Sequence, residues 1–412
     1  MKIKFVIVLF TISLLFFFSK SPLLAQKKYN SYNGLVMAGY QGWFNTPNDG
    51  TDRGWRHLSG RNGFKPGSCN IDVWPNVSEY TKTYPTDFKF TDGSSAQVFS
   101  SHDKSTVYTH FRWMKEYGID GVFMQRFVGE IKNESGLSHF NTVLASAFSA
   151  AKEYERAICI MYDLSGMQAG DSKVVLADID KLSLTYDMKT RDKCTTYLYQ
   201  NGKPLVCIWG IGFNDGRKYG LKDANWIVDG LIKRGFSVMI GVPTHWRELN
   251  SDTEADPDLH KVIKKCDILM PWFVGRYDEN SYPEYTSLIL KDLKWCSKNK
   301  IEYAPLVFPG FSWKNMKGYN TKQIARNGGS FFWKQISGAL SAGCKMLYVA
   351  MFDEMDEGTA IFKAATEVPV GESKFISIDK NLGSDYYLWL TGKAGEMLRG
   401  EKAVSSKLPI HK

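Results

Sequence analysis

The residues best suited to chemistry in this sequence are four carboxylates within five positions. Asp353, Glu354, Asp356 and Glu357 follow directly on an apolar run that begins at Met346. Carboxylates this close together raise one another's pKa values. A cluster of this kind at the end of a buried strand therefore needs a function or a bound cation.

Three explanations suit the cluster. Glycoside hydrolysis needs one carboxylic acid to protonate the leaving oxygen and a second carboxylate to act as base or nucleophile, and neighbouring acids with different pKa values meet that need. Calcium would take several carboxylate oxygens, but the spacing lacks the D-x-[DN]-x-[DN]-G loop. A solvated run of charge is the third explanation, and the apolar strand that leads into the cluster argues against it.

Eight apolar runs in the chain predict strands. They lack polar alternation, which is typical of strands buried on both faces in a parallel sheet covered by helices. The runs are residues 34–40, 121–126, 157–163, 204–210, 237–243, 267–272, 303–309 and 346–354.

Amphipathic stretches alternate with these runs and predict helices. They cover residues 106–117, 138–155, 172–186, 225–235, 258–266, 287–298, 329–343 and 385–400. Eight strand and helix units predict an α/β fold, a (β/α)8 TIM barrel with enlarged loops. A doubly wound open sheet is the alternative, because strand order cannot be read from a sequence. The longest loop, residues 44–104 after the first strand, is expected to wall one side of a cleft.

A barrel of this type builds its site at the C-terminal ends of its strands. The residues found there combine aromatic plates with hydrogen-bonding side chains, which suits a sugar ring with apolar faces and a rim of hydroxyl groups. The predicted substrate-binding residues are Tyr40, Gln41, Trp43, Gln125, Arg126, Asp163, Trp209, His245, Trp246, Trp272, Tyr277, Trp313 and Asp353. For any single one of them, a place in the core or in a structural ion pair is the competing interpretation.

One family resemblance accompanies these features. The stretch D-E-M-D-E-G-T at 353–359 resembles the E-W-x-E-G-T segment of glycoside hydrolase family 99 and its relatives related to family 71. The stretches GLVMAGYQGWF at 34–44 and FPGFSWKNM at 308–316 are similar to bacterial members of that group. The resemblance implies a retaining enzyme that acts on an α-linked glycan such as a mannan.

The resemblance also implies catalytic roles. Glu354 would take the proton of the substrate 2-hydroxyl, which forms a 1,2-anhydro sugar, and Glu357 would protonate the leaving group and later activate water. The sequence departs from the family motif in two places: Asp353 stands where Asn is common, and Met355 with Asp356 replaces an aromatic residue and its partner. The extra acids are expected to alter the pKa of either glutamate.

The N-terminus predicts export. Residues 1–26 have early lysines, an apolar stretch and then small and polar residues, the layout of a cleaved signal peptide, with a retained membrane anchor as the alternative. We expect residues 27–412 to form a single catalytic domain in the periplasm or outside the cell, without stable membrane insertion. The formal net charge of +9 is too mild and dispersed to favour nucleic acid.

The expected partner is an oligosaccharide or polysaccharide, and no cofactor or metal is expected. The seven cysteines show no C-x-x-C or metal-binding spacing, so few or no disulfides are expected. No G-x-S-x-G, G-x-x-x-x-G-K-[ST] or H-E-x-x-H signature competes. A non-catalytic carbohydrate-binding protein of the same fold is the alternative function.

A further hypothesis concerns substrate charge. Arginines follow several strands or lie in the long first loop, and paired guanidinium groups could hold an anionic glycan. The basic residues in question are Arg126, Arg247, Arg276, Arg53, Arg56, Arg61 and Lys65.

Overall fold

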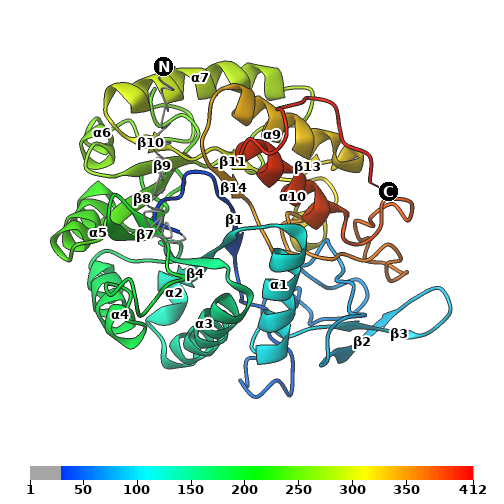
Figure 1. Cartoon of the computed structure of the whole chain (residues 1–412). Coiled ribbons are helices and arrows are strands. Elements are labelled where there is room, and N and C mark those ends of the chain that lie inside the picture. The colour runs from blue at the N-terminus through cyan, green and yellow to red at the C-terminus, as the bar shows by residue number, and fades with distance from the viewer. Residues whose placement is uncertain (1–28, 412) are drawn as a thin grey trace, which may run out of the picture.

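A closed parallel sheet forms the centre of the molecule, of which the computed structural model describes residues 29–411 (Figure 1). Its strands pair side by side in the order β10-β9-β8-β7-β5-β4-β1-β14-β11. They are β1 (Val36–Tyr40), β4 (Gly121–Phe127), β5 (Ala157–Asp163), β7 (Lys203–Trp209), β8 (Ser237–Val242), β9 (Ile268–Pro271), β10 (Glu302–Tyr303), β11 (Leu306–Val307) and β14 (Leu347–Val349). Each of the eight predicted runs supplies a barrel strand.

The seventh barrel strand closes the sheet, although a break divides it into β10 and β11. β10 pairs with β9, and β11 pairs with β14, both in parallel. Within the break, the Ala304 N–H still donates to the Leu269 carbonyl at 2.9 Å. Pro305 has no N–H to continue the ladder, but its carbonyl accepts from the Tyr348 N–H at 3.0 Å. The ring of strands is complete, which confirms the (β/α)8 barrel and excludes the open sheet.

Eight helices follow the barrel strands and surround the sheet (Figure 1). They are α1 (Lys104–Tyr117), α3 (Glu134–Tyr154), α4 (Ser172–Thr185), α5 (Leu221–Lys233), α6 (Asp258–Ile263), α7 (Tyr282–Lys298), α9 (Ser330–Ser341) and α10 (Tyr386–Leu398). Because helices cover the outer face and side chains fill the interior, all seven residues of β4 are buried. Burial on both faces explains why the strand-forming runs of the sequence are continuously apolar.

Short elements lie in the loops. They are α2 (Val128–Ile131), α8 (Lys314–Lys317), the 3-10 turn η1 (Asn327–Gly329), β6 (Tyr199–Gln200), β12 (Phe311–Ser312) and β13 (Gln323–Ile324). α8 and the antiparallel pair β12 and β13 belong to the segment that follows the seventh strand, at the end of the barrel where the cleft lies.

The long segment between β1 and α1 packs on the chain that follows β14. It contains an antiparallel hairpin of β2 (Tyr84–Lys89) and β3 (Ser95–Val98). Backbone bridges join Val73 to Ile376 and Pro75 to Ala364, and the buried Trp74 ring contacts the Phe375 ring at 5.0 Å. The two segments, far apart in sequence, therefore form one layer beside the barrel.

Between residues 29 and 411, no helix combines the length and the apolar composition that a membrane crossing needs. The predicted signal peptide, residues 1–26, lies outside the described residues. All seven cysteine side chains are free and buried.

Candidate active site

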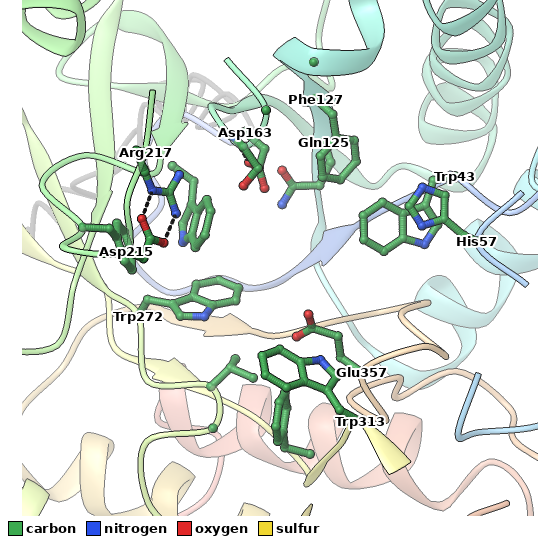
Figure 2. A pocket seen from close by; sticks show the side chains of 18 of the residues that line it. Trp43, His57, Gln125, Phe127, Asp163, Asp215, Arg217, Trp272, Trp313 and Glu357 are labelled. Carbon is green, nitrogen blue, oxygen red and sulfur yellow. Dashed lines mark hydrogen bonds and ion pairs between the residues drawn. The ribbon is translucent and has the colours of Figure 1, made fainter. Parts of the chain in front are cut away.

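A cleft of about 1010 Å³ opens at the C-terminal ends of the barrel strands. It lies where a (β/α)8 barrel places its site. Figure 2 shows side chains from several different strands and loops pointing into one open space. The predicted residues that line it are Trp43, Gln125, Asp163, Trp209, Trp272, Trp313 and Glu357.

Aromatic rings stand on two sides of the cleft. On one side, the Trp43 ring stacks on His57 at 4.0 Å and on Phe127 at 4.8 Å. On the other side, the Trp209 and Trp272 rings meet edge to face at 5.1 Å. Such rings offer flat apolar faces on which the CH groups of a sugar can pack. His57 belongs to the long first loop, and it lines the cleft, as expected of that loop.

The four clustered carboxylates have four different surroundings. The Asp353 side chain is fully buried, and its two oxygens accept the backbone N–H groups of Gln41 at 2.7 Å and Gly42 at 2.8 Å. Burial raises the pKa of Asp353 to about 7, and these two hydrogen bonds oppose the shift. Asp353 therefore fixes the chain that follows β1, and the structure does not bring it to the cleft wall.

Glu354 is buried and does not line the cleft. Its carboxyl group accepts a hydrogen bond from the Thr359 hydroxyl at 2.7 Å and another from the Gln41 side-chain amide. Burial raises the pKa of Glu354 well above its ordinary value, and the charges of Glu357 and Asp356 add to the shift. Gln41 is thus a support for a carboxyl group and does not line the cleft.

Asp356 faces the long first loop. One of its oxygens lies 3.4 Å from His57 Nδ1, on the same ring that stacks on Trp43. Asp356 is therefore connected to Trp43 through His57.

Glu357 is the member of the cluster that lines the cleft. Its side chain is half-buried, beside Trp313 (Figure 2). Burial and the charge of Asp356 raise the pKa of Glu357 to about 7, while the Trp313 indole N–H and the Lys317 ammonium oppose the shift. A carboxyl group with a pKa near 7 can both give and take a proton in neutral solution.

Gln125 and Asp163 lie across the cleft from Glu357 (Figure 2). Burial raises the pKa of Asp163, and the nearby Arg217 charge opposes the shift. Gln125 Oε1 is buried and has no hydrogen-bond partner among the described residues. These two side chains offer polar groups at the ends of adjacent strands, as a sugar hydroxyl would need.

Besides Gln41, Asp353 and Glu354, five further predicted residues lie outside the cleft lining, and they are left out of the proposed substrate site. Tyr40 is buried beneath the site, with its hydroxyl 2.8 Å from His110 Nδ1. Arg126 forms a buried ion pair with Asp178 at 2.5 Å on the helix side of β4. Neighbouring residues of a strand point to opposite faces, so Arg126 points outward where Gln125 points inward.

The other three belong to the later loops. Trp246 is fully buried, with its indole N–H 3.2 Å from an Asp292 oxygen. The Tyr277 hydroxyl donates to Gln335 inside the core at 3.1 Å. The His245 Nδ1 lies 3.1 Å from Asp252. Each of these three side chains is thus held by a partner within the protein.

Several cleft residues were not predicted from the sequence, among them His57, Asp215, Arg217, Lys317 and Lys322. Arg217 and Asp215 form an ion pair at 3.0 Å, and the guanidinium lies 4.9 Å above the Trp209 ring. Asp215 and Arg217 follow the last residue of β7, Trp209, by several positions, so they are not strand-end residues. His57 was missed for a similar reason, because it lies deep within a long loop.

Comparison with known proteins gives a fold but no family model. No family model matches the chain. The structure is similar to the family 99 endo-α-mannosidase from Bacteroides thetaiotaomicron, with a TM-score of 0.64 and 16% identity over 90% of this chain and 99% of that one. The chain has the fold of this endo-α-mannosidase. A glycoside hydrolase-like protein matches with a TM-score of 0.50 and 14% identity over 78% of this chain and 92% of that one.

The resemblance noted from the sequence is therefore confirmed in three dimensions. The same mannosidase in complex with Bis-Tris propane gives a TM-score of 0.62, with 16% identity over 89% of this chain and 98% of that one. The mannosidase is a glycoside hydrolase by description, and the structure with a TM-score of 0.50 is described as glycoside hydrolase-like. At 14–16% identity the likeness shows the fold.

The geometry does not favour calcium at the cluster. Among residues 29–411, no group of three or more His, Cys, Asp or Glu side chains is placed to hold a metal ion. The carboxylates point to different partners, from backbone N–H groups for Asp353 to the open cleft for Glu357. A proton-exchanging acid between aromatic walls is instead suited to acid catalysis on a sugar.

Proposed function

We propose that the chain is an exported glycoside hydrolase that cleaves an α-linked glycan, mannan-like or related, with retention of configuration. The observation that carries the proposal is Glu357, a half-buried carboxyl group in the cleft with a pKa raised to about 7. The aromatic walls and the fold shared with a family 99 endo-α-mannosidase support it.

In the proposed first step, the Glu357 carboxylic acid protonates the glycosidic oxygen, and the bond from that oxygen to C1 breaks. The ionised form of Glu354, which the hydrogen bonds from Thr359 and Gln41 favour, takes the proton of the sugar 2-hydroxyl, whose oxygen bonds to C1. In the second step, the Glu357 carboxylate takes a proton from water, and the water oxygen bonds to C1 as the anhydro ring opens. The proton on Glu354 returns to the 2-oxygen, so both carboxyl groups regain their starting states.

In the first step, the substrate would have to displace a protein contact to reach Glu354. Its carboxyl group is held by Thr359 and by the Gln41 amide, so a sugar 2-hydroxyl would have to replace the Gln41 contact to reach it. Gln41 is itself held in place through its backbone N–H by Asp353. In the proposed mechanism, these contacts keep Glu354 in position until substrate arrives.

The test is release of sugar from a panel of α-mannans and α-glucans by the purified mature protein, with Glu357→Gln run beside it. Release by the wild type and loss in the variant would support the proposal. Release by both proteins would contradict the role of Glu357. Tight glycan binding without any release would favour the non-catalytic binding protein.

Export is tested separately, by N-terminal sequencing of the protein recovered from the periplasm and the medium of the expressing cells. We expect the mature chain to begin near residue 27. A chain that still carries the apolar N-terminus and stays with the membrane would contradict the proposal.

A further inference from the structure

We infer that the cleft is built for a glycan that carries an anionic substituent, a uronic acid carboxylate or a sulfate ester, on the sugar next to Trp313. The groups that would read it are the ammonium groups of Lys317 and Lys322, here called the lysine rim. The inference rests on the proposed function, because it names the substrate class of the same cleft.

The arginines suggested by the sequence do not supply this charge. In the cleft, Arg217 is paired with Asp215 at 3.0 Å and Arg276 with Asp252 at 3.2 Å. Arg53 and Arg56 both contact Glu130. Outside the cleft, Arg126 is paired with Asp178, and Arg247 is paired with Asp292 at 2.8 Å. Each of these arginines thus already has a carboxylate partner in the protein, although Arg53 and Arg56 share the single carboxylate of Glu130.

The lysine rim differs from the arginines. Both lysines line the cleft, and neither forms an ion pair with a carboxylate in the described part of the chain. Lys322 Nζ instead donates to the backbone carbonyl of Gly275 at 2.9 Å. This contact holds the ammonium at the rim, where it acts on the Asp278 carboxylate only at longer range and forms no ion pair with it.

Lys317 changes what Trp313 offers to a ligand. Its Nζ lies 3.1 Å from the centre of the Trp313 ring. An ammonium in this position is held by the electrons of the ring and occupies a face on which a neutral sugar could have packed. That part of the cleft therefore presents a positive charge, whereas Trp43, elsewhere in the cleft, stacks on His57 and Phe127.

The acids that remain in the cleft offset this charge only in part. Glu357 and Asp163 have no lysine or arginine within ion-pair distance among the described residues. Burial disfavours the ionised form of both. The Lys317 ammonium is close enough to Glu357 to influence its proton equilibrium, so an anion bound there would lie near the proposed acid.

The test is direct binding in the Glu357→Gln background, which prevents turnover. The probes are two matched pairs: α-mannan oligosaccharides with and without added sulfate, and oligogalacturonides with free or methyl-esterified carboxyl groups. The sulfate pair and the uronate pair distinguish the two sources of charge. The variant is Lys317→Met with Lys322→Met. The control is Lys314→Met, because Lys314 lies on the same short helix with its ammonium over Tyr319, outside the cleft lining.

We expect the anionic member of at least one pair to bind about three- to tenfold more tightly than its neutral partner, with the preference weakened by salt. The double variant should lose this preference and Lys314→Met should keep it. Equal binding of the two members, a preference unchanged in the double variant, or no binding of any probe would overturn the inference. Hydrolysis of a neutral glycan by the wild type would leave the proposed function standing in each of these cases.

Discussion

The Asp353 carboxylate accepts the backbone N–H of Gln41 at 2.7 Å and that of the next residue at 2.8 Å. This contact joins the end of the eighth barrel strand to the end of the first, and these two strands are neighbours in the sheet. A carboxylate suits the position because it accepts through both oxygens, whereas an asparagine would turn its amide N–H₂ toward one of the two donors. The acid that stands here in place of the family's common Asn thus has a structural reason.

Asp353→Asn should reduce the pH dependence of stability. Burial raises the pKa of Asp353 from 3.8 to about 7, so between these values the folded chain binds more protons than the unfolded chain. The free energy of unfolding contributed by this group therefore falls as pH rises from about 4 to about 7. Asparagine does not ionise, so the variant should lose this part of the slope in urea unfolding followed at several pH values.

The control for this experiment is Asp87→Asn, which changes an exposed carboxylate on β2. It should leave the slope as in the wild type. An Asp353→Asn protein with the full wild-type slope would show that Asp353 does not ionise in this range.

His57 should support the aromatic wall at Trp43. Its ring stacks on Trp43 with an angle of 7° between the planes, and it contacts Asp356. We expect His57→Ala to cost about 0.5–1.5 kcal/mol of stability, the usual worth of an aromatic pair. It should also raise KM with little change in kcat, because Trp43 loses the imidazole ring that stacks on it.

His57→Phe separates the stacking from the contact with Asp356, because it keeps a ring and removes the nitrogen. We expect it to restore KM. If His57→Phe behaves like His57→Ala, the contact with Asp356 would be the function of His57, and stacking would not.

Hydrophobic runs predicted all eight barrel strands, because a strand buried on both faces is mostly apolar. The expectation that site residues lie at the C-terminal ends of strands was right for Trp43, Gln125, Asp163 and Glu357, which line the cleft. It misplaced Arg126, although alternation along β4 assigns Gln125 and Arg126 to opposite faces, so this error could have been avoided from the sequence.

Other parts of the site could not be predicted from local patterns. His57 reaches the cleft through a loop whose path depends on contacts with the chain after β14. The burial of Glu354 depends on the turn that brings Thr359 and Gln41 to its carboxyl group, and these residues come from different parts of the chain. Such positions are fixed by long-range packing, which sequence spacing does not record.

Glu354→Gln and Asp163→Asn should identify the carboxylate that works with Glu357. The proposed mechanism assigns that role to Glu354, whereas Asp163 lines the cleft beside Gln125. We expect Glu354→Gln to lower kcat by about 10²–10⁴, the usual range for a general base. Asp163→Asn should mainly raise KM, because it alters a contact with bound sugar.

Thermal unfolding of both variants would show whether a lost activity reflects a lost fold, since Glu354 is buried. A folded Glu354→Gln enzyme with wild-type kcat, together with an Asp163→Asn enzyme that has lost its kcat, would move the role of partner from Glu354 to Asp163.

The pH profile of activity should depend on the charges around Glu357. As the proposed acid, Glu357 must hold its proton, so kcat/KM should decline as pH rises through about 7. Asp356 raises the pKa of Glu357, so Asp356→Asn should move the decline to lower pH. Lys317 lowers the same pKa, so Lys317→Met should move the decline to higher pH. Lys314→Met, which changes a lysine outside the cleft lining, should leave the profile in place.

Shifts of opposite sign cannot come from a general loss of stability, which would lower activity at every pH. If both variants move the decline in the same direction, or neither moves it, a group other than Glu357 controls the alkaline side of the profile.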